Sequence, residues 1–206
     1  MGHLDRRQHW DRVYGDKAEH EVSWFQAEPV SSLEFIRHCG GGKNAAIIDI
    51  GGGESHLVDR LMTASYVDVT VLDLSAHAIQ RTRQRLGAAA ERVHWIIADI
   101  AQWMPARRYR LWHDRAVLHF LTEQKDREAY VRALLAAVEP GGCVVISTFA
   151  LDGPERCSGL PVHRYSAETL AAELGPDFKL VETVRDEHRT PGGIVQPFQF
   201  SRFTRL

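Results

Sequence analysis

Short apolar runs alternate with helix-forming segments from residue 45 to residue 148, and this alternation restricts the fold more than any other feature of the chain. The expected strands are residues 45–50, 67–72, 93–97, 109–113 and 143–148, and the expected helices between them are residues 55–63, 76–86 and 123–138. Connections of this kind are right-handed and place the strands in a parallel sheet with helices on both faces. The sequence therefore predicts a doubly wound α/β fold.

The flanking segments have different patterns. Residues 1–42 are polar with interleaved aromatics and include a helical run, residues 30–39, that ends at three glycines. Residues 178–204 contain two extended segments joined by a turn around Pro191 and Gly193, which predicts an antiparallel hairpin at the edge of the sheet. We expect a single domain of seven strands, divided into an N-terminal helical part (1–42), a core (45–148) and a C-terminal loop and hairpin (149–206).

Composition excludes several classes of protein. The chain has 25 Lys plus Arg and 27 Asp plus Glu, and its net charge of -2 gives no strong attraction to nucleic acid or to an anionic membrane. No run approaches the length of a membrane span, and the first residues lack the apolar core of a secretion signal, so we expect a cytoplasmic protein. Three scattered cysteines predict reduced thiols, and no spacing predicts a metal site.

Glycines and acidic residues follow the expected strands, where open α/β sheets bind ligands. Asp49, Gly51 and Gly53 form a turn into a helix, whose free N–H groups favour an anionic ligand. Asp73 follows the second strand, about twenty positions later, where a carboxylate can accept hydrogen bonds from ribose hydroxyls. Asp99 follows the third strand, where its carboxylate can accept a hydrogen bond from the exocyclic amine of an adenine. The structural alternatives are a simple tight turn for the glycine segment and a helix N-cap for Asp73.

Taken in order, these segments resemble the class I S-adenosylmethionine-dependent methyltransferases, which have a Rossmann-like fold. The resemblance rests on D-x-G-x-G at residues 49–53, the acids Asp73 and Asp99, a D-x-A-x-x-H-like segment from Asp114, and the Pro-Gly-Gly turn at residues 140–142. It covers residues 45–148 well and the flanks loosely. One departure is Ser55, which stands where many members have a third glycine.

The resemblance implies S-adenosylmethionine as cofactor, S-adenosylhomocysteine as product and an N-terminal helical lid. Asp49, Gly51 and Gly53 are then expected to hold the methionine portion, Asp73 the ribose and Asp99 the adenine amine. The remaining expected cofactor contacts come from the lid and from the strand ends: Trp24, Leu74, Ile100 and Asp114. Trp24 or Tyr14 is expected to close over the sulfonium, because a cation is favoured beside an aromatic face.

Two further groups of residues are candidates for catalysis and for binding the acceptor. Asp114 and His119 follow the fourth strand, and His119 is a candidate general base, with a packing histidine as the alternative. A base is needed only when the nucleophile arrives protonated. The expected acceptor residues follow the fifth strand or lie in the hairpin: Arg156, Cys157, Arg164, Tyr165 and His188. Cys157 is alternatively a buried structural thiol, and His188 and Gln196 are alternatively a pair that joins the hairpin strands.

The favoured interpretation is methyl transfer to a sulfur, nitrogen or oxygen atom of a small molecule, because the chain has neither a basic surface nor a separate recognition domain. A protein lysine methyltransferase is the first alternative, suggested by the aromatic N-terminal segment. A non-catalytic protein that binds an adenosine ligand and a nicotinamide dehydrogenase are the others. The Pro-Gly-Gly turn before the fifth strand favours a methyl donor over a nicotinamide.

Overall fold

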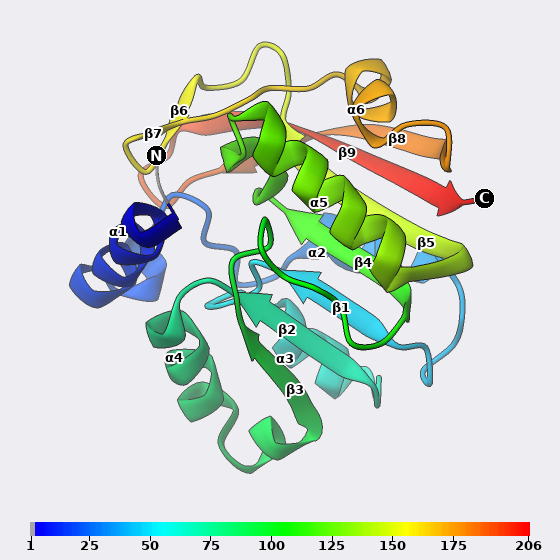
Figure 1. The fold of residues 1–206 in the computed structure, drawn as a ribbon. Helices are drawn as coiled ribbons and strands as arrows, with labels where there is room; N and C mark the ends of the chain where they lie inside the picture. Colours follow the sequence, from blue (N-terminus) through cyan, green and yellow to red (C-terminus); the bar gives the residue numbers. More distant parts are fainter. Residues whose placement is uncertain (1–2) are drawn as a thin grey trace.

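A computed structural model describes residues 3–206, and a seven-stranded sheet runs through its centre (Figure 1). The strand order is β3-β2-β1-β4-β5-β9-β8. The first five strands are parallel, and β9 pairs antiparallel with both β5 and β8. Their bounds are β1 Ile47–Ile50, β2 Val69–Asp73, β3 Val93–Ile97, β4 Tyr109–Arg115, β5 Val138–Phe149, β8 Phe178–Arg189 and β9 Val195–Arg205. The predicted doubly wound, mostly parallel fold with a C-terminal hairpin is confirmed.

Six α-helices flank this sheet in the described part of the chain: α1 His3–Asp16, α2 Val30–His38, α3 Leu57–Thr63, α4 Ala76–Leu86, α5 Gln124–Ala137 and α6 Ala167–Leu174. Short 3-10 turns cover Glu19–Glu21, Gly87–Arg92 and Leu118–Phe120. Helix α1 lies beside the ends of the strands rather than on a face of the sheet (Figure 1). The strands thus point their carboxyl ends toward a segment that is far away in the sequence.

Successive residues of each central strand are buried on opposite faces of the sheet. Ile48 and Ile50 pack in a cluster with residues of α5 and α6, whereas Ile47 packs with residues of α2 and α3. All four residues of β1 are buried. Helices on both faces therefore explain why these strands are continuously apolar in the sequence, as expected for a parallel sheet.

The hairpin of β8 and β9 has the predicted turn, and His188 lies opposite Gln196 in its register. One helix and one pair of short strands were not predicted. Helix α6 begins with Ser166, whose hydroxyl accepts a hydrogen bond from the Thr169 amide, and the two-residue strands β6 Arg156–Cys157 and β7 Leu160–Pro161 pair with each other. Both lie in the segment that was expected to be a loop.

The prediction of three reduced thiols is wrong for two of them. Cys39, after α2, forms a disulfide with Cys143 in β5, and their Cα atoms are 5.6 Å apart. Helix α2 packs against β5, and this packing brings together two residues that are 104 positions apart in the sequence. Such a contact depends on the fold and has no local sequence signal. Cys157 is a free, buried thiol.

Among residues 3–206, none of the helices combines the length and the apolar character that a membrane span requires.

Candidate functional site

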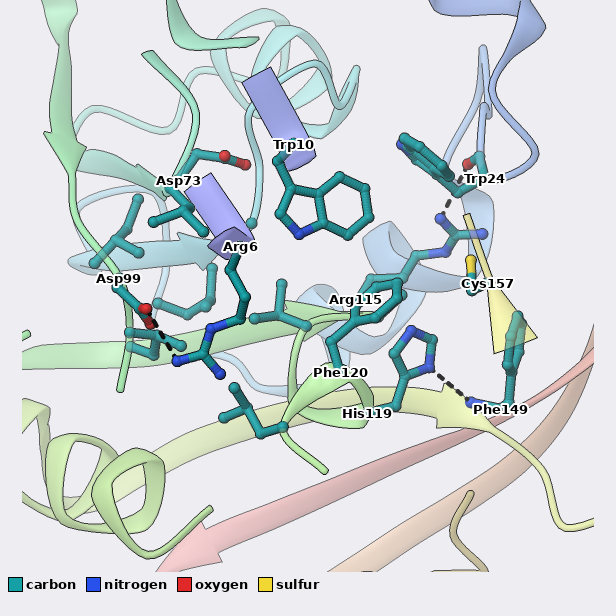
Figure 2. Close-up of a pocket in the computed structure, with 18 of the residues that line it drawn as sticks. Arg6, Trp10, Trp24, Asp73, Asp99, Arg115, His119, Phe120, Phe149 and Cys157 are labelled. Atoms are coloured by element: carbon teal, nitrogen blue, oxygen red, sulfur yellow. Dashed lines mark hydrogen bonds and ion pairs between the residues drawn. The ribbon is translucent and has the colours of Figure 1, made fainter. Parts of the chain in front are cut away.

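A cavity of about 100 Å³ opens at the carboxyl ends of the parallel strands, beneath α1 (Figure 2). One end is lined by residues that follow β1, β2 and β3: Gly51, Asp73, Leu74, Asp99 and Ile100. The other end is lined by residues that follow β4 and β5 and by the hairpin: Arg115, His119, Phe120, Phe149, Cys157, Gln196 and Phe198. We call these the cofactor end and the acceptor end, after the roles that the sequence predicts for their residues. Trp10 and Trp24 line the cavity from the N-terminal segment.

Asp73 is held at the cofactor end by the backbone around it. Its Oδ2 accepts a hydrogen bond from the Gly53 amide at 2.9 Å, and its Oδ1 accepts one from the Ser75 amide at 2.7 Å. The side chain is buried, and this burial raises its pKa to about 6, even though the two amide hydrogen bonds favour the charged form. Ser75, not Asp73, is the side-chain N-cap of α4. The alternative reading of Asp73 as the helix cap is therefore unnecessary.

Asp49 is joined to a buried polar chain beneath the glycine turn. Its Oδ1 lies 2.7 Å from Nδ1 of His113, and Nε2 of the same ring lies 2.9 Å from the Ser32 hydroxyl. The other carboxylate oxygen, Oδ2, is buried and has no hydrogen-bond partner. Asp49 lines a second cavity of about 50 Å³, which shares Trp24, Gly51 and Arg115 with the first.

The glycine turn is shaped by close approaches that exclude side chains. Gly51 has a φ of +69°, and a Cβ there would lie 2.1 Å from Cγ2 of Val117. A Cβ on Gly53 would lie 2.6 Å from Asp73 Oδ2. Both glycines are therefore needed for the turn, because a Cβ would collide with Val117 at position 51 and with the Asp73 carboxylate at position 53.

Asp99 is also engaged at both oxygens. Oδ1 accepts a hydrogen bond from the Ala101 amide, and Oδ2 lies 3.1 Å from Nη2 of Arg6 on α1 (Figure 2). Arg6 also pairs with Asp126 of α5 at 2.8 Å, and all three side chains are buried. The N-terminal helix is therefore connected to the cofactor end of the cavity by an ion-pair network.

Aromatic rings of the N-terminal segment pack above the cavity. Trp10 lies edge-on to Trp24 and to Phe120, with ring centroids 5.6 Å and 5.0 Å apart, and Tyr14 lies edge-on to Trp24. These rings contact one another and also line the cavity. Trp24 therefore both packs against neighbouring rings and lines the cavity.

His119 is fully buried at the acceptor end. The Phe149 amide donates to its Nδ1 at 3.4 Å, and its Nε2 is buried without a hydrogen-bond partner (Figure 2). Burial and the positive charge of Arg115 lower its pKa to about 3. The ring is therefore neutral at pH 7, and the donated hydrogen bond at Nδ1 leaves the ring proton on Nε2.

Asp114 does not line either cavity. Its carboxylate accepts hydrogen bonds from the Val117 amide at 2.8 Å, the Leu118 amide at 3.1 Å and the Tyr130 hydroxyl at 2.7 Å. Burial raises its pKa to about 6. These contacts hold the turn after β4 in place, so Asp114 supports the cavity wall. Asp114 was predicted to contact a cofactor, but it is not among the residues that line either cavity.

Most of the predicted acceptor residues lie outside both cavities. Arg164 pairs with Glu155 and donates to the Gly153 carbonyl, and Arg156 is exposed. Tyr165 is buried against α6, and His188 donates from Nε2 to the Ser23 carbonyl at 2.6 Å. Of the residues predicted to bind the acceptor, Cys157 alone lines the cavity.

Among the cavity residues that sequence reasoning missed are Arg6, Arg115, Phe149 and Phe198. Arg115 and Phe149 are the last residues of β4 and β5, so strand-end position was an available signal for them. Phe198 lies opposite Phe149 in the register of β9, which only the hairpin pairing reveals. Arg6 has no local signal, because its partner Asp99 is 93 positions away.

Comparison with known protein families matches residues 47–142 to the family described as "Methyltransferase domain". Among curated proteins, the chain is 32% identical over 114 residues to nodulation protein S of Sinorhizobium fredii, an alignment that covers 55% of this chain and 50% of that protein. It is 24% identical over 107 residues to malonyl-[acyl-carrier protein] O-methyltransferase 2 of Ilyobacter polytropus, covering 52% and 40%. The chain thus aligns with about half the length of these relatives.

Solved structures share the fold over nearly the whole chain. A SAM-dependent methyltransferase from Anabaena variabilis matches with a TM-score of 0.77 at 12% identity, covering 99% of this chain and 95% of that one. The N-methyltransferase NodS from Bradyrhizobium japonicum, in complex with S-adenosylhomocysteine, matches with a TM-score of 0.69 at 18% identity, covering 95% and 97%. Residues 47–142 thus match a methyltransferase domain, and the chain as a whole shares its fold with structures of S-adenosylmethionine-dependent methyltransferases.

Proposed function

We propose that this protein transfers the methyl group of S-adenosylmethionine to a nucleophilic atom of a small-molecule acceptor. The observation that supports this proposal best is that one cavity joins the two ends described above. Asp73 and Asp99 lie at one end, and Phe149 and Phe198 lie at the other. Such a cavity allows two ligands to meet inside a shielded space. Among structures with the same fold, one is an N-methyltransferase with bound 1,6-didemethyltoxoflavin, a small acceptor.

The residues at the cofactor end fit the proposed cofactor. Asp73 presents a carboxylate that two backbone amides already orient, which suits a ribose with two neighbouring hydroxyls. Leu74 and Ile100 offer apolar surfaces beside Asp99, which suits an adenine. Asp49 Oδ2 is buried and unpartnered, and this oxygen can accept a hydrogen bond from the ammonium of the methionine portion.

When bound, S-adenosylmethionine supplies a methyl group made electrophilic by a positively charged sulfur. The contribution of the chain is then to place the acceptor in line with that methyl group and to exclude water. Proximity and orientation can supply about 7–11 kcal/mol of the barrier reduction. Trp10, Trp24 and Phe120 shield the cavity from the N-terminal side and suit this role.

We infer that His119 acts as a hydrogen-bond donor through Nε2 and not as the general base that the sequence suggested. A base works well when its pKa lies near the working pH, and the pKa of His119 is lowered to about 3. Its Nδ1 already accepts a hydrogen bond from the Phe149 amide. We therefore expect the nucleophile to enter the cavity already without its proton.

Two measurements test the proposed function. Isothermal titration should show that the wild type binds S-adenosylhomocysteine and that Asp73→Ala weakens this binding by at least about tenfold, since one lost ribose contact of about 1.4 kcal/mol has that effect. Asp152→Ala is the matched control, because Asp152 is an exposed acid paired with Arg185 in the hairpin. Unchanged affinity of Asp73→Ala would contradict the assignment.

The second measurement follows labelled methyl groups from S-adenosylmethionine into a desalted extract that contains the wild type or Asp73→Ala. Products are separated into macromolecular, soluble small-molecule and volatile fractions. We expect label in the small-molecule or volatile fraction with the wild type only. Label in a protein band would favour the alternative, a protein lysine methyltransferase.

A further inference from the structure

The acceptor end contains buried hydrogen-bond donors that make no hydrogen bond to any described residue. Arg115 donates from Nη1 to the Trp24 carbonyl at 3.1 Å, whereas its Nε and Nη2 are buried and have no hydrogen-bond partner. Nε2 of His119 is likewise buried and without a partner. Figure 2 shows both side chains in the same part of the cavity, beside Cys157. These side chains leave three unpartnered nitrogen atoms whose N–H groups a ligand with oxygen atoms can satisfy.

The guanidinium of Arg115 is fixed in place and keeps its charge. It lies 4.9 Å from the centroid of the Phe198 ring, which supports it by a cation–π contact. Burial lowers its pKa to about 10, so the group is still positively charged at neutral pH. The carboxylates of Asp49 and Asp186 are near enough to act on it electrostatically, but neither makes a hydrogen bond to it.

The two unpartnered nitrogens have a geometry that selects among anions. Nε–H and one N–H of Nη2 point to the same side of a guanidinium, and together they match the two oxygens of a carboxylate. The neighbouring walls are the rings of Phe120, Phe149 and Phe198. A ligand with a carboxylate at one end and an apolar or aromatic body beside it therefore fits this space.

We propose that Arg115 binds a carboxylate of the methyl acceptor, so that the acceptor is a small organic acid with an apolar or aromatic body. His119 Nε2–H serves the same ligand as a second donor. This inference rests on the proposed function, because it assigns the acceptor end of the same cavity. Because Nε and Nη2 are shielded from water, the acid can reach them only if the side chains that cover them shift.

The test uses protein saturated with S-adenosylhomocysteine, so that the cofactor end is filled. Acetate, benzoate, phenylacetate and indole-3-acetate are titrated by calorimetry, each beside its neutral amide. We expect at least one acid to bind the wild type about tenfold or more tightly than its amide. Arg115→Met should lose this preference. Arg115→Lys, which keeps the charge but not the two-nitrogen fork, should keep part of it and shows that the cavity still folds.

Matched controls use the two arginines that the sequence assigned to acceptor binding. Arg156→Met and Arg164→Met remove positive charge outside the cavity and should leave the preference for the acid unchanged. The proposal is overturned if no acid is preferred over its amide by the wild type, or if either control variant removes the preference as Arg115→Met does.

A carboxylate is also present in the methionine portion of the cofactor, and a separate titration distinguishes the two sources. The protein without ligand is titrated with S-adenosylhomocysteine and with 5′-methylthioadenosine, which lacks the amino-acid portion. We expect Arg115→Met to bind both within about twofold of the wild type. A large loss for S-adenosylhomocysteine alone would assign Arg115 to the cofactor and overturn the proposal. Failure of the wild type to bind S-adenosylhomocysteine would instead overturn the proposed function, and the inference with it.

Discussion

The guanidinium of Arg6 and the carboxylate of Asp99 form a buried ion pair across the cofactor end of the cavity, with 3.1 Å between Nη2 and Oδ2. The pair connects α1 to Asp99, which is expected to accept a hydrogen bond from the adenine amine. Since Asp126 is bound to the same guanidinium, α1 is held at two points. We therefore expect that a nucleoside reaches Asp99 only when the ion pairs of Arg6 with Asp99 and Asp126 break.

We predict that Arg6→Met makes α1 open more often and increases the association rate of S-adenosylhomocysteine. The physical reason is that the substitution removes the buried ion pairs of Arg6 with Asp99 and Asp126, and losing the cation beside a buried carboxylate destabilises the closed arrangement. Stopped-flow fluorescence of Trp10 and Trp24 measures the rate, and hydrogen exchange measures opening of α1. Arg7→Met, which is exposed on the same helix, is the control. An association rate equal to that of the wild type would show that α1 does not limit entry.

The pKa of Asp73 predicts how binding depends on pH. Ribose hydroxyls donate to a carboxylate, and the pKa of Asp73 in the ligand-free protein is raised to about 6 by burial. We therefore expect the affinity for S-adenosylhomocysteine to be nearly constant above pH 7 and to fall by up to about tenfold for each pH unit well below 6. Titration calorimetry from pH 5 to pH 8 measures this. Asp73→Asn should bind weakly with a flat profile, and an equally steep profile in that variant would assign the effect to another group.

The same shift predicts an effect on stability. A carboxyl whose pKa is higher in the folded state than in the unfolded state contributes stability below its unfolded value, 3.8, and this contribution is lost as the pH rises through about 6. Relative to the wild type, Asp73→Asn should therefore gain up to about 3 kcal/mol in the free energy of unfolding between pH 4 and pH 7.

Urea unfolding of both proteins at several pH values measures this difference. Asp152→Asn should change with the opposite sign, because the Arg185 hydrogen bond lowers the pKa of Asp152. A difference between Asp73→Asn and the wild type that does not change with pH would contradict the raised pKa.

The disulfide between Cys39 and Cys143 predicts a stability that depends on redox conditions. The bond closes a loop of about 100 residues, for which the chain-entropy treatment gives up to about 4–5 kcal/mol. Reduction, or Cys39→Ser, should lower the melting temperature, whereas Cys157→Ser should leave its sensitivity to reductant unchanged. Thiol titration of the denatured protein should find one free thiol before reduction and three after it. Three thiols before reduction would contradict the bond.

The sequence predicted the features that depend on local patterns. The five parallel strands, the helices between them and the hairpin follow from apolar periodicity and glycine positions, and Asp73, Leu74, Asp99 and Ile100 follow from strand ends. Helix α6 was missed, although Ser166 and Thr169 give it an N-terminal signal, because the segment was interpreted as a loop.

What the sequence could not predict depends on contacts between distant residues. The hydroxyl of Tyr130 on α5 holds Asp114, so that carboxylate supports a turn instead of facing a ligand. Cys39 meets Cys143 only because α2 packs against β5. The Nε and Nη2 atoms of Arg115 are buried and make no hydrogen bond. Burial of one side chain in a cavity has no signature in a single sequence.

The close approach of Gly51 to Val117 restricts which residues homologues can carry at these two positions. Because a Cβ at position 51 would overlap the Val117 side chain, the turn that follows β1 and the turn that follows β4 share one small space. A larger residue at position 51 becomes tolerable only after position 117 becomes smaller, and the positive φ at Gly51 adds a second cost. The two positions are therefore expected to vary together among homologues.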